Sequence, residues 1–407
     1  SQYIAPTDAR REWISGLSGS SGTALVTAKE ALLWTDARYY TQFYLQVNTT
    51  LWKLMKQGTD APIQTWLVNN LKSGSVVGVD PTTYTRSAWT SLANTLSPWN
   101  ITLYATSENL VDLARDNIHD PPPPRPENQL IPHPIEYSGK RAGEKISQLL
   151  LQIEERGATA LVLTALDDIA YTLNLRGSDI PYNPVFFSYL ILRVDAAATN
   201  KVILFWGSGQ LYSKISQFLL DQGVQLEVRP YREIFDYLTK MSNALPERST
   251  IWLADTGSHA IFLAAEGKGH TTIISTISPV ALIKCVKNEV ELALFLTIGK
   301  GGTLWLLIPQ RPEEVNFMGP SFATIAGAGE NGAIIHYKPD PESDHRSIGP
   351  NDMLLVDSGG QYRDGTTDIT RTRHMSGSPT SMQRLAFTRV LKGHILLGTV
   401  VFPRGTV

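Results

Sequence analysis

The sequence predicts an α/β fold arranged as three consecutive segments, residues 1–120, 127–280 and 281–407. In the first two segments, short apolar runs typical of strands alternate with stretches of helical periodicity, which is the pattern of an α/β layer. A run of prolines separates these two segments. A chain of 407 residues agrees with two or three domains, since one domain commonly has about 100–200 residues.

The first segment shows this alternation. Residues 24–27 and 31–35 are typical of paired strands around a polar turn. Pro62 suits the start of a helix. Apolar residues follow it at helical spacing, namely Ile63, Trp66, Leu67 and Leu71. Residues 76–81 then predict a buried strand that ends in a turn.

Residues 121–126, with the sequence Pro-Pro-Pro-Pro-Arg-Pro, are the clearest boundary in the chain. Such a run favours a stiff polyproline II conformation and is excluded from helices and central strands. We interpret it as a linker; a ligand for an SH3-type domain is the alternative.

In the second segment, Ser138 is a candidate N-cap for a helix. The helix that follows carries an apolar stripe at Ile146, Leu149, Leu150 and Ile153. Short apolar runs at residues 160–164, 202–205 and 250–254 predict strands, with helices between them. The third segment begins less regularly, because glycines and a proline interrupt residues 293–310; order is expected again from residues 322–325.

The most informative part of the chain is residues 354–372, which are typical of two strands around a polar turn with one carboxylate on each strand. Asp357 follows an apolar run, so we expect its strand to be buried on both faces, where a carboxylate is costly unless it is paired or bound to a metal. Asp368 lies among β-branched residues that favour a strand. Asp364-Gly365 is a good turn dipeptide.

The register of this hairpin decides what the two aspartates can do. Directly opposed residues of an antiparallel pair have Cβ atoms about 4.5–5.5 Å apart, close to the ~3.5–4 Å that separates the metals of a hydrolytic pair. A strict two-residue turn at Asp364-Gly365 would place Asp357 opposite Thr372 instead. Opposing Asp357 to Asp368 requires a longer loop or a bulge near residues 362–363. A solvated hairpin with turn aspartates is the alternative.

Composition narrows the functional class. The net charge of −2 gives no reason to expect a nucleic-acid partner, and no apolar run reaches the ~18 residues of a transmembrane span. The single cysteine, Cys285, rules out an intrachain disulfide and favours the cytoplasm. Two glycosylation sequons, at Asn48 and Asn100, point instead to a secreted or membrane-anchored protein, so the compartment stays open.

Several stretches, taken together and in order, resemble the Xaa-Pro aminopeptidases, which are dinuclear metallopeptidases with the pita-bread fold. They are residues 15–23, 34–39, 165–170, 173–184, 331–337 and 354–372. The resemblance covers nearly the whole chain except residues 293–318. It implies two creatinase-like N-terminal α/β domains followed by an α+β pita-bread catalytic domain.

The resemblance also implies roles for individual residues. Asp357 and Asp368 correspond to metal ligands of a dinuclear site that takes Mn²⁺, with Zn²⁺ as the alternative. His336 corresponds to a catalytic, substrate-contacting histidine; the alternative is a core histidine. Arg38 corresponds to a substrate contact supplied by a neighbouring subunit; the alternative is an ion pair with Asp36. The implied substrates are peptides with proline in the second position, and the implied assembly is a homodimer.

The chain departs from the family pattern near its C-terminus. The family's metal pair uses two aspartates, one histidine and two glutamates, and the last three would follow position 400, so we expect the C-terminal catalytic part to be missing. Two aspartates would hold metals weakly and would leave no general base. The alternatives to an active peptidase are a non-catalytic binding scaffold and a creatinase-like amidinohydrolase.

Overall fold

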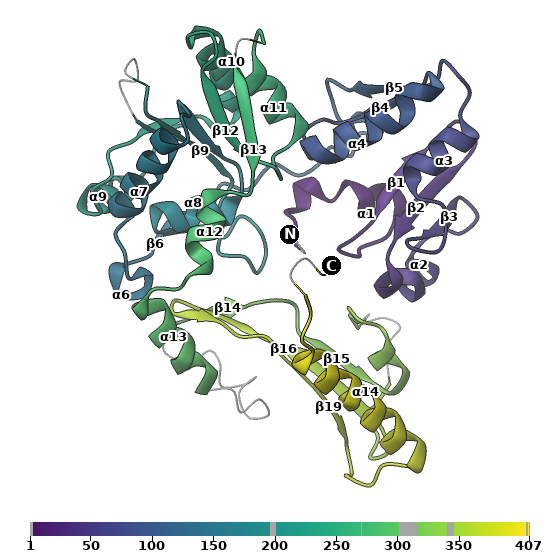
Figure 1. Ribbon diagram of the computed structural model, residues 1–407. Helices are drawn as coiled ribbons and strands as arrows, with labels where there is room; N and C mark the ends of the chain where they lie inside the picture. The colour runs from purple at the N-terminus through teal and green to yellow at the C-terminus, as the bar shows by residue number, and fades with distance from the viewer. Residues whose placement is uncertain are drawn as a thin grey trace. The chain divides into compact units, whose positions relative to one another are not determined.

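The computed structural model of the protein describes residues 3–195, 201–269, 271–300, 316–339, 346–403 and 406. The chain forms two compact units, which are described separately. The first comprises Ser1–Phe322 and Gly360–Thr367, and the second comprises Ala323–Gly359 and Asp368–Val407. Helices and strands are labelled in Figure 1.

The first unit begins with a three-stranded sheet, β1-β2-β3, and a two-stranded sheet, β4-β5. The strands are β1 (Thr23–Val26), β2 (Ala31–Thr35), β3 (Trp52–Lys56), β4 (Val76–Val79) and β5 (Thr102–Ala105). β1 and β2 pair antiparallel across a turn closed by the Thr27 amide donating to the Glu30 carbonyl at 2.9 Å. This confirms the two strands predicted at residues 24–27 and 31–35.

Helices surround these strands. They are α1 (Arg10–Ser15), α2 (Tyr40–Gln46), α3 (Ile63–Asn70), α4 (Arg86–Leu96) and α5 (Leu110–Asn117), with 3₁₀ helices η1 (Pro6–Asp8), η2 (Ala37–Tyr39) and η3 (Ser97–Trp99). Pro62 is the N-cap of α3, as predicted, and Trp66 and Leu67 on that helix pack against Leu32 and Trp34 of β2.

The expectation that residues 76–81 form a buried strand was wrong in its burial. β4 is present, but Val76 is 63% exposed and the strand alternates between exposed and half-buried side chains. Its sheet has only two strands, β4 and β5, which pair in parallel. An apolar run of this length is compatible with one covered face as well as with two.

The middle of the first unit is a six-stranded sheet in the order β11-β10-β9-β7-β12-β13. The strands are β7 (Ala160–Leu163), β9 (Ser188–Arg193), β10 (Val202–Trp206), β11 (Glu227–Arg229), β12 (Thr250–Ala254) and β13 (Thr272–Thr276). β9 runs antiparallel to both of its neighbours, and the other pairings are parallel. The strands predicted at residues 160–164, 202–205 and 250–254 are confirmed.

Helices cover both faces of this sheet (Figure 1). They are α7 (Ala142–Glu155), α8 (Leu166–Leu173), α9 (Ser213–Asp221), α10 (Ile234–Ala244), α11 (His259–Glu266) and α12 (Pro279–Cys285), with 3₁₀ helix η4 (Tyr231–Glu233). Along β7, Leu161 and Leu163 pack on the α7 side, and Ala160 and Val162 pack on the α10 side. A strand buried on both faces reads as a continuous apolar run, which is why the sequence located it.

Ser138 is not the N-cap predicted for the long helix. It ends the short helix α6 (Ile135–Ser138), because Gly139 follows in the left-handed conformation with φ of 65°, and the N-cap of α7 is Arg141. The apolar stripe predicted on α7 is confirmed, with Ile146, Leu149 and Ile153 buried.

Smaller elements complete the first unit. They are β6 (Ile131–Pro132), β8 (Leu175–Arg176), α13 (Glu289–Lys300), β14 (Phe317–Pro320), β17 (Gly360–Tyr362) and β18 (Gly365–Thr366). β6 pairs with β8, and β14, β17 and β18 form a three-stranded sheet. The first residues of the stretch 293–310 continue α13, and the rest of that stretch lies outside the described residues.

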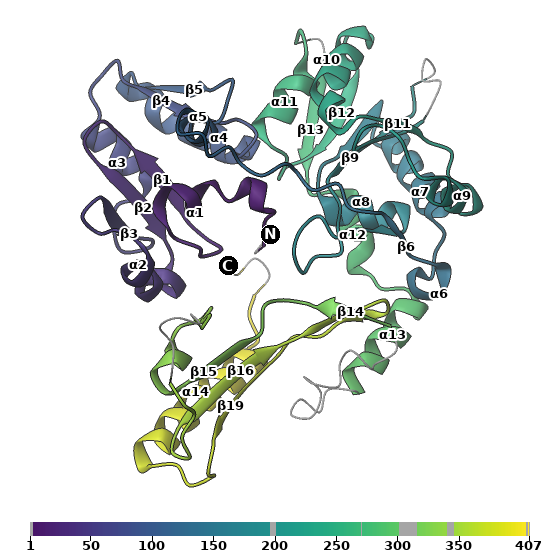
Figure 2. The same cartoon turned by 180° about the vertical axis from the view of Figure 1, so that it is seen from behind.

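The second unit contains the sheet β15-β16-β19, which Figure 2 shows from behind. Its elements are β15 (Ile325–Ala328), η6 (Gly329–Ala333), β16 (Met353–Ser358), β19 (Ile369–His374) and α14 (Ser381–Thr399). Thr380 and Gln383 form a capping box at the start of α14, none of whose residues is buried. Within the described residues, no helix combines the length and the apolar character needed to cross a membrane.

Candidate metal site

The two candidate metal ligands lie in the second unit. Asp357 is the fifth residue of β16, and Asp368 immediately precedes β19. β16 alternates between half-buried and buried positions, with Asp357 half-buried, so the expectation of a strand buried on both faces was wrong. The two faces of the sheet are covered to different degrees. Leu354 and Val356 point to the better-covered face, and Asp357 points to the other.

The hairpin register differs from both of the arrangements considered from the sequence. Tyr362 pairs with Gly365, so the two-residue turn consists of Arg363 and Asp364. The same register continues through β16 and β19 and places Asp357 opposite Thr370. Asp357 therefore faces neither Thr372 nor Asp368.

The register nevertheless brings the two carboxylates near each other. Asp368 comes two residues before Thr370, so it is a diagonal neighbour of Asp357 on the same face. Burial raises the pKa of Asp368, and the negative charge of Asp357 raises it further. The pair is therefore close enough for the two charges to repel each other.

Asp357 also has an unsatisfied atom. Its Oδ1 is buried and has no hydrogen-bond partner in the described part of the chain. A buried carboxylate oxygen without a donor is costly, and Asp368, a more exposed carboxylate beside it, adds to the oxygen ligands that hard divalent cations favour. The residues present therefore fit a cation. Within the described residues, no group of three or more His, Cys, Asp or Glu side chains converges as a metal site.

His336 lies in the same unit, in a stretch that forms no strand. The chain makes the 3₁₀ helix η6 and then a turn, in which the Tyr337 amide donates to the Ile334 carbonyl at 3.1 Å. Gly329, with φ of 58°, sets the chain in a left-handed conformation that a strand does not contain. The His336 side chain is half-buried.

Arg38, on η2, forms the ion pair with Asp36 that the sequence analysis gave as the alternative to a substrate contact. Its Nε and Nη2 donate to the two carboxylate oxygens of Asp36, both at 2.8 Å, and this pairing holds the pKa of Asp36 well below its usual range. The Arg38 side chain is 46% exposed, and its guanidinium lies 5.1 Å from the centre of the Tyr39 ring.

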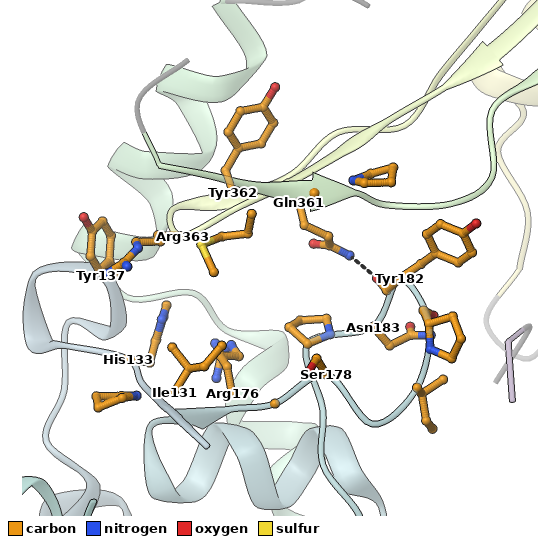
Figure 3. A pocket seen from close by; sticks show the side chains of 18 of the residues that line it. Ile131, His133, Tyr137, Arg176, Ser178, Tyr182, Asn183, Gln361, Tyr362 and Arg363 are labelled. Carbon is orange, nitrogen blue, oxygen red and sulfur yellow. Dashed lines mark hydrogen bonds between the residues drawn. The ribbon is translucent and has the colours of Figure 1, made fainter. Parts of the chain in front are cut away.

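Sequence reasoning missed a second polar cluster, which lies in the first unit. His133 and Arg176 line the same cavity, with Tyr137 stacked beside His133 (Figure 3). In the sequence, Arg176 falls within the family-like stretch 173–184, whereas His133 was given no role. The two prolines that flank His133 were the available signal, because they fix the backbone on both sides of it.

Comparisons with known proteins agree with this architecture. Residues 1–116 and 121–291 each match a model of the creatinase/prolidase N-terminal domain, and residues 266–407 match metallopeptidase family M24. These matches confirm the predicted fold class, with creatinase-type N-terminal domains followed by a pita-bread metallopeptidase domain.

Individual relatives cover the whole chain. The Xaa-Pro aminopeptidase ApepP of Drosophila melanogaster is 39% identical over 430 residues, covering 99% of this chain and 68% of the relative. A probable Xaa-Pro aminopeptidase P of Laccaria bicolor is 40% identical, covering 100% of this chain and 65% of the relative. The crystal structure of X-prolyl aminopeptidase from Caenorhabditis elegans, described as a cytosolic enzyme with a di-nuclear active site, matches with a TM-score of 0.86 at 32% identity, covering 100% of this chain and 68% of that one. The chain thus spans about two thirds of the length of these relatives.

Proposed function

The chain belongs to the Xaa-Pro aminopeptidase family of M24 metallopeptidases, and we propose that the protein releases the N-terminal residue from peptides that have proline in the second position. The observation that carries this proposal is the carboxylate pair of Asp357 and Asp368, with its unsatisfied Asp357 oxygen. An Xaa-Pro bond lacks the amide N–H that most peptidases bind, so a dedicated enzyme is chemically reasonable.

In this proposal, Asp357 and Asp368 are metal ligands. Divalent cations held by these two residues would activate a water molecule and polarise the scissile carbonyl. Mn²⁺ is the proposed metal because carboxylate oxygens suit it, and Zn²⁺ is the alternative. Asp368 lies two residues before Thr370, the partner of Asp357, so both residues are on one face of the hairpin, as a shared ligand requires.

His336 is the proposed contact to the substrate. A histidine N–H can donate a hydrogen bond to the peptide carbonyl and hold it while negative charge develops on the oxygen. Arg38 is the proposed substrate contact across a homodimer. Its Nε and Nη2 are held by Asp36, and its Nη1 has no acceptor among the described residues, which leaves that end of the guanidinium for a peptide carbonyl or carboxylate.

The cytoplasm is the proposed compartment, supported by the single cysteine and by the C. elegans relative, which is described as cytosolic. A scaffold without catalysis and a creatinase-like amidinohydrolase remain the competing functions. The carboxylate pair argues against the latter, because a metal-free reaction does not need two adjacent carboxylates.

The test combines activity with metal content. The purified protein is incubated with Mn²⁺, and release of arginine from Arg-Pro-Pro is followed while bound metal is measured by mass spectrometry. We expect hydrolysis and retained manganese, with both lost in Asp357→Ala. Asp364→Ala is the matched control, because Asp364 lies in the turn of the same hairpin and also has a buried oxygen without a partner among the described residues. Retained metal without hydrolysis would favour the scaffold, and hydrolysis unchanged in Asp357→Ala would refute the assigned site.

Arg38→Ala tests the dimer contact separately. Because both side chains of the Arg38–Asp36 pair are partly exposed to solvent, its loss should change stability by less than about 1 kcal/mol. A large rise in KM at unchanged stability would support substrate binding, and an unchanged KM would leave Arg38 with its ion pair alone. Sedimentation velocity of the same samples reports whether the protein is a dimer.

A further inference from the structure

A cavity of about 430 Å³ lies in the first unit, where two loops of the middle segment meet the β14-β17-β18 sheet (Figure 3). Residues 131–134, 137, 176–178 and 180–184 form one side of it, and residues 318–320 and 361–363 form the other. All of these residues belong to the first unit. The volume falls within the roughly 300–1,000 Å³ that is usual for small-molecule sites.

The walls of the cavity are apolar and stiff. Five prolines and three aliphatic or thioether side chains line it: Pro132, Pro134, Pro181, Pro184, Pro320, Ile131, Ile180 and Met318. Tyr182 adopts φ of 66°, a conformation that a non-glycine residue holds only when its surroundings impose it. The Gln361 Nε2 donates to the Tyr182 carbonyl at 2.9 Å and fixes this loop against β17. The cavity is therefore formed before any ligand arrives.

The charged groups of the lining all have one sign. Arg176 and Arg363 are the charged side chains of the lining, His133 lies beside them, and none of the described lining residues is an aspartate or glutamate. Burial lowers the pKa of His133 to about 3, and Arg176, Lys145 and Arg363 contribute to this lowering. His133 is therefore neutral near pH 7, and the two arginines of the lining give the cavity a positive potential, which an apolar wall of low dielectric strengthens.

The hydrogen bonds of Arg176 leave one edge of its guanidinium available. Its Nη1 donates to the carbonyls of Leu175 and Ala170, at 3.0 and 3.4 Å. Its Nε and Nη2 have no acceptor in the part of the chain that the structure describes. These two N–H groups lie parallel on one edge of the planar group and match the two oxygens of a carboxylate.

The nearest acidic side chains are committed elsewhere. Asp179 accepts the backbone amides of Asn128 and Phe187, each at 2.8 Å, and does not line the cavity. Glu291 accepts the Asn288 amide at 2.9 Å at the start of α13. Glu291 acts on Arg176 only as a more distant charge that opposes the lowering of its pKa by burial.

We propose that this cavity binds a small organic carboxylate, with its carboxyl group on the free edge of Arg176 and its apolar body against the proline-lined walls. The apolar lining favours such a ligand over inorganic phosphate, which would lose its hydration without compensating donors on every side. Among the described lining residues, no carboxylate is present to pair with an organic cation. The proposal goes beyond peptide hydrolysis and is tested without it.

The probe is 2-naphthoate, measured by calorimetric titration into the purified protein, with the neutral 2-naphthamide and inorganic phosphate as comparisons. The His133 ring resonance in NMR spectra is a second readout, since it reports a ligand in the cavity directly. We expect naphthoate to bind and to shift the His133 resonance, and we expect naphthamide and phosphate to do neither.

The variants separate the guanidinium edge from charge alone. Arg176→Lys keeps a cation but removes the paired N–H groups, and should weaken naphthoate by about tenfold or more, as expected for the loss of a charge-assisted hydrogen bond. Arg363 lies at an exposed turn position, so Arg363→Gln should not affect folding and should weaken naphthoate binding less than Arg176→Lys does. Arg371→Gln, an exposed arginine on β19, is the matched control and should leave binding unchanged.

Equal binding of naphthamide would show that the cavity is purely apolar and would overturn the proposal. Competition by phosphate at a concentration comparable to that of naphthoate would also overturn it. No binding to the unmodified protein would also overturn it. If Arg176→Lys does not fold, the Arg363→Gln affinity and the His133 shift decide: a shift with weakened binding supports the proposal, and no shift refutes it.

Discussion

Lys145 is a buried cation, and we predict that it makes the protein more stable as the pH rises above neutrality. It lies on α7, is 2% exposed, and donates from Nζ to the Tyr171 carbonyl at 2.9 Å and to Asn174 Oδ1 at 2.7 Å. Its Nζ also lies 3.7 Å from the centre of the Tyr171 ring. Among the described residues, no carboxylate forms an ion pair with it.

Burial lowers the pKa of Lys145 from 10.5 to about 7; Arg176 and Lys140 lower it further, and Glu291 opposes them. At a pH between these two pKa values, the lysine is neutral in the folded protein and charged in the unfolded chain, so unfolding takes up a proton. The free energy of unfolding therefore rises with pH, by at most ~1.4 kcal/mol per unit. Between pH 7.5 and 9.5 the contribution integrates to about 2.5 kcal/mol.

The perturbation is Lys145→Met, which keeps an unbranched stem and removes the titrating group. Urea unfolding, followed by tryptophan fluorescence at pH 7.5 and 9.5, gives the change in unfolding free energy for each protein. We expect the unmodified protein to gain about 2.5 kcal/mol more than Lys145→Met over this interval. Lys214→Met, an exposed lysine on α9, is the matched control and should follow the unmodified protein. Parallel pH dependences for Lys145→Met and the unmodified protein would refute the reasoning.

Two further predictions concern polar networks of the first unit. Asp168 is 3% exposed and accepts from Ser278 Oγ at 2.5 Å and Lys284 Nζ at 2.7 Å, so Asp168→Ala should cost roughly 2–4 kcal/mol of unfolding free energy in urea titrations. Its neighbour Asp167 pairs with the same lysine but is 67% exposed, and Asp167→Ala should cost less than about 1 kcal/mol; equal losses would contradict the role of burial. Arg86 donates from Nη1 to His259 at 3.0 Å, and burial, followed by the charge of Arg86, lowers the pKa of His259 to about 4. Arg86→Ala should raise that pKa in an NMR titration of the imidazole, and an unchanged value would show that burial acts alone.

The fold was predictable wherever local pattern and tertiary environment agree. β7 and β10 are buried on both faces, and the apolar stripe of α7 faces a core, so composition alone identified them. β4 was misjudged because an apolar run does not state how many layers cover it. Ser138 was misjudged because a serine suits an N-cap and also the last turn before a left-handed glycine, and only the φ of Gly139 distinguishes the two.

The candidate site was predictable as residue types but not as geometry. The register depends on which two residues form the turn, and Arg363-Asp364 carries no glycine to reveal it. Gly365, which the sequence placed within the turn, instead begins β18 opposite Tyr362. A shift of one residue in the turn changes the partner of Asp357 by two positions, from Thr372 to Thr370. Long-range information was therefore required for the relation between Asp357 and Asp368.

The carboxylate pair should lower the stability of the metal-free protein, and this gives a test that does not depend on catalysis. The buried Oδ1 of Asp357 lacks a donor in the described chain, and its charge acts against that of Asp368. Asp357→Asn removes this repulsion, so we expect the metal-free variant to be more stable by about 0.5–1 kcal/mol. Added Mn²⁺ should stabilise the unmodified protein by mass action and leave the variant unchanged. A variant that is less stable without metal, or that Mn²⁺ still stabilises, would contradict the inference that these aspartates bind a cation and lower the stability of the metal-free protein.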